Sequence, residues 1–206
     1  MRGFLRFSLK AAVGLAILGG VVFGVMRLLF LTPVTITHQG MAPTLLAGER
    51  VLMWRDRDLE LGDIAVCVHP ERNETVIGRV LGMTNNTVET ERGRVLVSGS
   101  EATRDIMGDI AFFNSDVGQS VDVKRVLLEF GNTTHEVFED ERELRFATVQ
   151  VPSGSVYLLG DNRPDATHDS RTYGPMPESS CIGVVFMRTE PVDIGLDLGH
   201  SWLEFL

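Results

Sequence analysis

The sequence has few cysteines and lacks the groupings that metal sites and nucleic-acid partners require. Its two cysteines, Cys67 and Cys181, stand in the apolar runs "IAVCVHP" and "CIGVVFM", without the histidine or cysteine neighbours of a zinc site. We therefore predict no metal and no cofactor. The net charge is −9, and an acidic chain of this kind argues against nucleic acid as a partner. Internal repeats, low-complexity tracts and long segments of strong helical period are also missing.

Acidic residues are absent from the first 32 positions, which contain four bases. Residues 11–26 are sixteen uninterrupted apolar or small residues, and "LLFL" follows Arg27. A membrane-spanning helix needs about 20 apolar residues. The pattern therefore predicts a transmembrane signal-anchor helix at 11–32, with Arg27 reaching the far interface. A cleavable secretory signal is the alternative, but no small-x-small cleavage site precedes Pro33.

The bases at the start predict the orientation of the chain by the positive-inside rule. Residues 1–10 are expected in the cytoplasm, and residues 33–206 form an extracytoplasmic or periplasmic domain. The protein would then be a single-pass protein of the inner (cytoplasmic) membrane. Because the first 32 residues contribute +4, the remaining chain carries −13. A disulfide is permitted in that compartment, and two buried free thiols fit the apolar runs equally well.

Short runs rich in Val, Ile and Leu, separated by Gly, Asn, Pro or Asp, predict a mainly antiparallel β domain. Asn85 and Glu91 mark expected hairpin turns. The more polar stretch at about 101–150 indicates an insertion or subdomain, and its acidic run at 136–145 is expected to be a solvated face, with a docking surface as the alternative. The apolar segment 193–206 is expected to pack on the domain; contact with the membrane or with another subunit is the alternative.

A polar cluster follows the run "SVYLLGD". It holds eight charged or hydrogen-bonding residues, besides Thr167, in the eleven positions from Asp161 to Arg171. Such density beside a core strand predicts a network of hydrogen bonds and ion pairs. The network could be a structural corner or the wall of an active site. Its members are Asp161, Asn162, Arg163, Asp165, His168, Asp169, Ser170 and Arg171.

Four blocks of sequence resemble the type I signal peptidases, in that family's order and behind a membrane anchor. The blocks are "GMAPTL" at 40–45, "LGDIAVCVHP" at 61–70, "GRVLG" at 78–82 and "GDNRPDATHDSR" at 160–171. The resemblance covers roughly residues 1–188, and only the 101–150 region is unmatched. It implies a signal-peptidase-like antiparallel β-sheet domain with one N-terminal transmembrane helix.

The resemblance also implies a chemistry, which this sequence departs from. The family removes signal peptides from exported proteins with a serine nucleophile and a lysine general base. The nucleophile position is Gly40 and the base position is Gly78, so neither role has a side chain. The family's oxyanion serine corresponds to His38. The hydroxyl that orients the lysine corresponds to Thr167, with Ala166 as the ungapped alternative.

Substitutes for the missing groups are scarce. The chain has two lysines: Lys10 is expected on the cytoplasmic side, and Lys124 lies in the unmatched insertion. His38, with a neighbouring threonine, and His168 are the remaining candidates for an unusual catalytic group. The sequence around both glycines also differs from the family pattern. Such wide differences are typical of natural sequence drift rather than of mutations introduced to trap an uncleaved complex.

The residues that shape the family's site are retained in this sequence, although the nucleophile and the general base are not. By carry-over, we expect Arg79 to pair with Asp161 and Asp169 to pair with Arg171. The sequence therefore predicts an inactive homologue that binds a signal peptide, an exported precursor or another membrane protein. An accessory structural subunit and an active peptidase with unusual residues are the alternatives. The retained residues are Met41, Pro43, Thr44, Arg79, Asp161, Asn162, Arg163, Asp169, Ser170 and Arg171.

Overall fold

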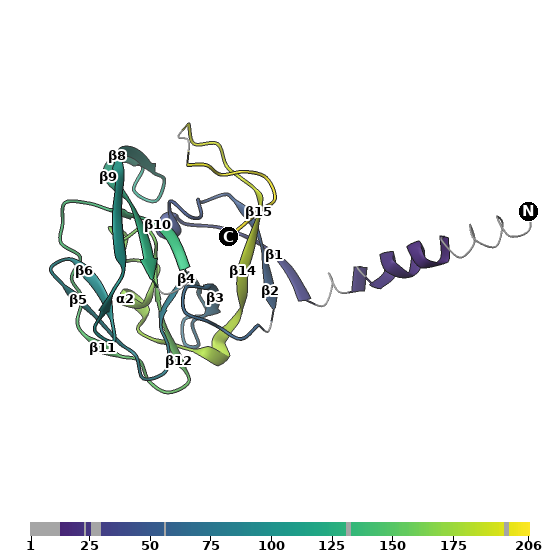
Figure 1. The fold of residues 1–206 in the computed structure, drawn as a ribbon, viewed down its shortest axis with the longest axis horizontal. Helices are drawn as coiled ribbons and strands as arrows, with labels where there is room; N and C mark the ends of the chain where they lie inside the picture. Colours follow the sequence, from purple (N-terminus) through teal and green to yellow (C-terminus); the bar gives the residue numbers. More distant parts are fainter. Residues whose placement is uncertain (1–12, 23, 26–29, 56, 131–132, 196–197) are drawn as a thin grey trace, which may run out of the picture.

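The computed structural model describes residues 13–22, 24–25, 30–55, 57–130, 133–195 and 198–206. Residues 13–22 are helical with exposed side chains, and in Figure 1 this helix projects away from the β domain. No helix within the described ranges is long and apolar enough to cross a membrane. The anchor predicted at 11–32 includes positions 11–12, 23 and 26–29, which lie outside the described residues.

An eight-stranded antiparallel sheet forms the centre of the molecule (Figure 1). Seven of its strands follow one another in the order β1-β2-β14-β3-β4-β12-β13, and the short β15 pairs with β14. The strands β3 and β4 are buried along nearly their whole length, which explains their continuous apolar sequence. Their bounds are β1 Leu31–Thr35, β2 Arg50–Arg55, β3 Ile64–Val68, β4 Thr75–Gly82, β12 Ser155–Leu159, β13 Met176–Pro177, β14 Cys181–Glu190 and β15 Glu204–Phe205.

Two smaller antiparallel sheets complete the β domain. One has the order β11-β5-β6-β7, with β5 Thr87–Glu91, β6 Arg94–Val97, β7 Ser100–Glu101 and β11 Val149–Gln150. The other has the order β10-β9-β8 and lies within the stretch predicted as an insertion, with β8 Thr103–Asn114, β9 Gln119–Phe130 and β10 Thr133–Glu139. The predicted mainly antiparallel β class is confirmed.

Two local predictions have different outcomes. The turn after Glu91 joins β5 to β6, which pair as a hairpin, as expected. The turn at Asn85 was expected to close another hairpin, and this is wrong because the strands on either side, β4 and β5, belong to different sheets. Asn85 has a φ of 68° and its N–H donates to Val151 O, so the turn redirects the chain from one sheet to the next.

A disulfide joins Cys67 on β3 to Cys181 on β14, whose Cα atoms lie opposite each other at 3.7 Å. This resolves the alternatives for the two cysteines in favour of the bonded pair. The disulfide lies beside a buried apolar cluster that includes Val76, Val156 and Leu158. It therefore ties two neighbouring strands of the central sheet across 114 positions of sequence.

The C-terminal segment packs on the domain, as expected. Its β15 pairs with β14, and its His200 contacts Glu49 through Nδ1 at 2.7 Å and Pro43 O through Nε2 at 2.7 Å. Glu49 is fully buried and also forms an ion pair with Arg188 at 3.1 Å. These contacts fix the C-terminal segment against the turn that follows the predicted nucleophile position.

Candidate functional site

The predicted nucleophile position, Gly40, lies in the 3₁₀ turn η1 (Gln39–Met41), between β1 and β2. The side chain of His38 caps this turn, because its Nδ1 accepts a hydrogen bond from Gly40 N at 3.2 Å. The turn is held from the opposite side by Asn162, whose N donates to Gly40 O at 3.1 Å and whose Nδ2 donates to Gln39 O at 3.0 Å. The backbone that would present a nucleophile is thus fully positioned.

Gly160 permits this close approach. A Cβ atom at position 160 would lie 2.3 Å from Gly40 O, a distance that real Cβ atoms do not adopt. The first residue of the 160–171 block is therefore required to be glycine so that the block can lie directly against η1.

The predicted base position, Gly78, lies on β4, and η1 packs against that strand. Met41 and Ile77, which flank the two glycines, belong to one buried apolar cluster. A Cβ atom added at position 78 would lie 2.9 Å from Leu158 Cβ on the neighbouring strand β12. A lysine therefore does not fit at position 78 unless β4 and β12 move apart.

The predicted pair of Arg79 and Asp161 is confirmed. Arg79 Nε donates to Asp161 Oδ1 at 3.0 Å and Nη2 donates to Oδ2 at 2.6 Å, and both side chains are buried. Thr44 Oγ1 donates to Asp161 Oδ2 at 2.5 Å, and Arg79 Nη1 donates to Gly62 O at 2.8 Å. The guanidinium and these hydrogen bonds lower the pKa of Asp161, although burial alone would raise it.

The predicted pair of Asp169 and Arg171 is also confirmed, with Nη2 and Oδ2 at 2.6 Å. Asp169 caps the short helix α2 (Ser170–Tyr173) and accepts from Gly160 N at 2.9 Å. Ser170 Oγ accepts from Leu158 N at 2.9 Å. These side chains all stabilise backbone of the 158–171 segment, which favours the structural-corner interpretation over an active-site wall for this part of the cluster.

Two histidines stack directly over Gly40. The rings of His38 and His168 are 4.0 Å apart and nearly parallel, with an interplanar angle of 5°. A Cβ atom at position 40 would meet His38 Nδ1 at 3.0 Å and His168 Cβ at 3.4 Å. The ring of His38 and the Cβ atom of His168 therefore border the space that a nucleophile's side chain would enter.

The environment of His38 makes it a poor general base. Burial, assisted by the neighbouring His168, lowers the pKa of His38 to about 4. Its Nδ1 already accepts from Gly40, and its Nε2 is buried without a hydrogen-bond partner. A base of such low pKa takes a proton from a hydroxyl group inefficiently at neutral pH.

Thr167 and His168 do not form a catalytic relay either. Thr167 Oγ1 lies 2.7 Å from His168 Nδ1, and Asp165 Oδ2 lies 3.4 Å from the same Nδ1. A triad needs one ring nitrogen facing the nucleophile and the other facing the carboxylate. Because a single nitrogen makes both contacts, the geometry fixes the ring and offers no path for a proton through it.

The turn between β8 and β9 contributes residues that the sequence had not pointed to. Asp116 Oδ2 accepts from Gln39 N at 2.7 Å, and Ser115 Oγ accepts from Gln39 Nε2 at 3.2 Å. The residues "NSD" are typical of any turn, so nothing in the sequence distinguished them. The 101–150 region, unmatched by the family blocks, therefore contacts η1 through these two residues.

Among the residues that the structure describes, one group of side chains is spaced closely enough to hold a metal ion. Ligand atoms of Asp116, Asp165 and His168 lie within 4.8 Å of one another, although the sequence had indicated no metal. Each already bonds within the site: Asp116 to the η1 backbone, and Asp165 and His168 to Thr167. The group is accounted for by these contacts.

The other residues that the sequence singled out lie in several different places. Met41 is buried in the core, and Pro43 lies in the turn that His200 contacts. Lys124 lies on β9 opposite Glu139, and Lys10 lies outside the described residues. The backbone of Arg163 bonds to Phe138 O at 2.9 Å, while its side chain enters a separate pocket.

Comparison of the sequence with known proteins gives a matching family and several relatives. The profile described as "Signal peptidase, peptidase S26" matches residues 9–189. Signal peptidase IB of Staphylococcus aureus is 27% identical over 175 residues, covering 83% of this chain and 84% of that protein. Signal peptidase I of Streptococcus pneumoniae is 24% identical over 201 residues, covering 93% and 97%. A solved signal peptidase I from Enterococcus faecalis has a TM-score of 0.38 at 24% identity, covering 62% of this chain and 97% of that one.

Proposed function

The chain belongs to the signal peptidase family, peptidase S26, and we propose that it binds the family's class of substrate without cleaving it. The observation that carries the proposal is the pair of glycines at positions 40 and 78, set in an intact frame. The backbone of η1 is held by His38 and Asn162, as a working site would need. Among the described residues, the side chains nearest to a Cβ atom at position 40 are those of His38 and His168, and the strands around Gly78 leave no room for a lysine.

The proposed ligand is the signal peptide of an exported precursor or of another membrane protein. We expect this ligand to contact the surface beside η1, near the exposed Thr167. Strand β4 is buried and pairs with β3 on one edge and with β12 on the other, so its own edges are not available to a peptide strand. Binding without cleavage would hold the precursor at the membrane. The same frame also suits an accessory subunit of a membrane complex, with the acidic domain as its contact surface.

We place the protein in the inner (cytoplasmic) membrane, with the β domain on the extracytoplasmic side. Support comes from the bases that precede the apolar N-terminal run and from the exposed apolar side chains of residues 13–22. The disulfide between Cys67 and Cys181 suits an oxidising compartment. An alkaline phosphatase fused after position 206 should be active; an inactive fusion would contradict this orientation.

Cleavage and binding are tested together on the purified full-length chain in mild detergent. With a signal-peptide-bearing precursor, we expect no cleavage under conditions in which an active family member completes the reaction. Removal of triad members costs an active peptidase on the order of ten-thousandfold in rate. Cleavage that disappears in His38→Ala or His168→Ala would overturn the proposal in favour of a peptidase with unusual residues.

Binding is detected by a photoreactive amino acid at Thr167, an exposed residue beside the cleft. We expect crosslinks to a signal peptide, and we expect an excess of unlabelled signal peptide to abolish them. The matched control carries the same group at Arg92, whose side chain is 89% exposed on the β5–β6 turn. Crosslinks from Thr167 to a fixed membrane protein, unaffected by signal peptide, would instead identify an accessory subunit.

A further inference from the structure

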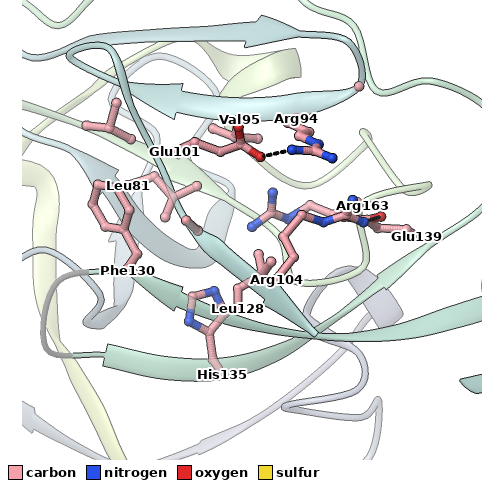
Figure 2. A pocket seen from close by; sticks show the side chains of 13 residues that line it. Leu81, Arg94, Val95, Glu101, Arg104, Leu128, Phe130, His135, Glu139 and Arg163 are labelled. Carbon is pink, nitrogen blue, oxygen red and sulfur yellow. Dashed lines mark hydrogen bonds and ion pairs between the residues drawn. The ribbon is translucent and has the colours of Figure 1, made fainter. Parts of the chain in front are cut away.

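A separate pocket lies where the three sheets meet (Figure 2). Its walls come from the end of β4, from β6 and β7, and from β8, β9 and β10. The centre of a water-sized group can occupy about 30 Å³ of this pocket, which is enough for a carboxylate group. The pocket is partly open to solvent, so a longer ligand can extend from it along the walls. Figure 2 shows the arginines Arg94, Arg104 and Arg163 on one side of the pocket, with Leu81 and Phe130 on the other.

Arg163 is the unusual member of this pocket. It is 5% exposed, and its Nε is buried and has no hydrogen-bond partner among the residues that the structure describes. Within the described part of the chain, its guanidinium has no ion-pair partner. A buried guanidinium without a counter-charge is costly, because burial disfavours the charged form. The three nearest acids each pair with another arginine: Asp161 with Arg79, Glu139 with Arg104, and Asp169 with Arg171.

The other charges of the pocket cancel. Arg94 and Glu101 form an ion pair at 2.6 Å, and Arg104 pairs with Glu139 at 2.5 Å. His135 lines the pocket with both ring nitrogens buried and unpaired, and burial lowers its pKa to about 3, so it is neutral. One positive charge remains, on Arg163. The pocket therefore has one positive charge more than it has negative charges, and one anionic group would balance it.

We propose that this pocket binds a monocarboxylate with a short apolar chain. The carboxylate would accept two parallel hydrogen bonds from the Arg163 guanidinium, the geometry that this group favours. The chain would lie against Leu81, Val95 and Phe130. A phosphate or sulfate fits less well because it brings about two negative charges and no apolar surface to these walls. The carboxylate can belong to the C-terminal residue of a peptide or to a free short-chain acid.

The experiment measures binding to the full-length chain in detergent by isothermal titration calorimetry. The probes are sodium pentanoate, 1-pentanol and sodium sulfate. We expect pentanoate to bind at least tenfold more tightly than either of the other two. Equal binding of pentanol would show that the charge is irrelevant, and equal binding of sulfate would show an unspecific anion site; either result overturns the proposal.

A variant of Arg163 tests whether pentanoate binds in this pocket. Arg163→Gln should weaken pentanoate binding at least tenfold, whereas Arg57→Gln, on the β2–β3 connection and outside the pocket, should leave it unchanged. Unaltered binding by folded Arg163→Gln overturns the assignment. Should that variant not fold, Val95→Phe fills the pocket from the wall and should abolish binding, with retained binding again contradicting the proposal.

Two further probes distinguish the source of the carboxylate. These are acetyl-Ala-Val with a free C-terminus and the same dipeptide as its amide. Tighter binding of the free dipeptide than of pentanoate identifies a peptide C-terminus as the ligand; tighter binding of pentanoate identifies a free acid. This site is independent of the cleft at Gly40, so failure of one proposal leaves the other standing.

Discussion

At the scale of single residues, the packing around Gly78 leaves no space for a side chain at this position. Gly78 faces Leu158 Cβ at a distance that leaves no room for a Cβ atom. A Cβ atom added at position 40 would lie next to the ring of His38 and 3.4 Å from the Cβ atom of His168. A ring can turn aside, whereas a Cβ atom moves only with its backbone.

We therefore expect Gly78→Ala to lower the free energy of unfolding by about 1–3 kcal/mol, as overpacking of a buried site does. Gly40→Ala should change it by less than about 0.5 kcal/mol, since the gain in chain stiffness offsets a small shift of His38. Urea denaturation of both variants and the parent checks the difference. Equal destabilisation by the two substitutions would show that β4 and β12 are not closed around Gly78.

At the scale of elements, the disulfide joins two strands whose order in the sheet differs from their order in the chain. Cys67 and Cys181 close a loop of 114 positions. In the chain-entropy account, a loop of this length stabilises the fold by about 4–5 kcal/mol through restriction of the unfolded chain. Reduction should therefore lower the urea midpoint strongly without changing which strands pair.

The double variant Cys67→Ala and Cys181→Ala is the control for this prediction. It should match the reduced protein in stability and should not respond to dithiothreitol. A response of the double variant would show that the reductant acts elsewhere, and an unchanged midpoint of the parent on reduction would contradict the predicted role of the disulfide.

The sequence predicts the strands correctly where a local pattern of residues determines them. The runs around Val66, Ile77 and Leu158 are short, apolar and bounded by turn residues, and each is a strand. The partners of each strand were not readable, because pairing depends on contacts distant in sequence. The Asn85 turn illustrates this, since its residues suit a hairpin and a change of sheet equally well.

The contacts of the candidate site can likewise be separated into those that the sequence predicted and those that it did not. The resemblance to the family predicted the pair of Arg79 and Asp161 and the pair of Asp169 and Arg171, because the matching blocks bring those residues together. It did not predict that Asp116 binds η1 across 77 positions, since no block covers that region. Nor did it predict that the side chain of Arg163 lines a separate pocket, because side-chain direction depends on the three sheets that meet there.

At the scale of the whole molecule, two buried histidines make the fold sensitive to acid. The pKa of His38 is lowered to about 4 and that of His135 to about 3, in both cases chiefly by burial. In the unfolded chain each returns to about 6.5. Between these values the unfolded chain binds more protons than the folded one, so stability is fully present above pH 6.5 and is lost as the pH falls.

We expect each histidine to contribute about 3 kcal/mol to the loss of stability between pH 7 and pH 4, since one pKa unit corresponds to about 1.4 kcal/mol. His135→Leu should reduce that loss by about half. It should also maintain or raise stability at pH 7, because both ring nitrogens of His135 are buried without partners. Urea unfolding followed by tryptophan fluorescence across this pH range measures both effects. An unchanged pH slope in His135→Leu would mean that His135 has the same pKa in the folded and the unfolded chain. A partner that stabilises its protonated ring would then have to lie in the pocket beside Arg163.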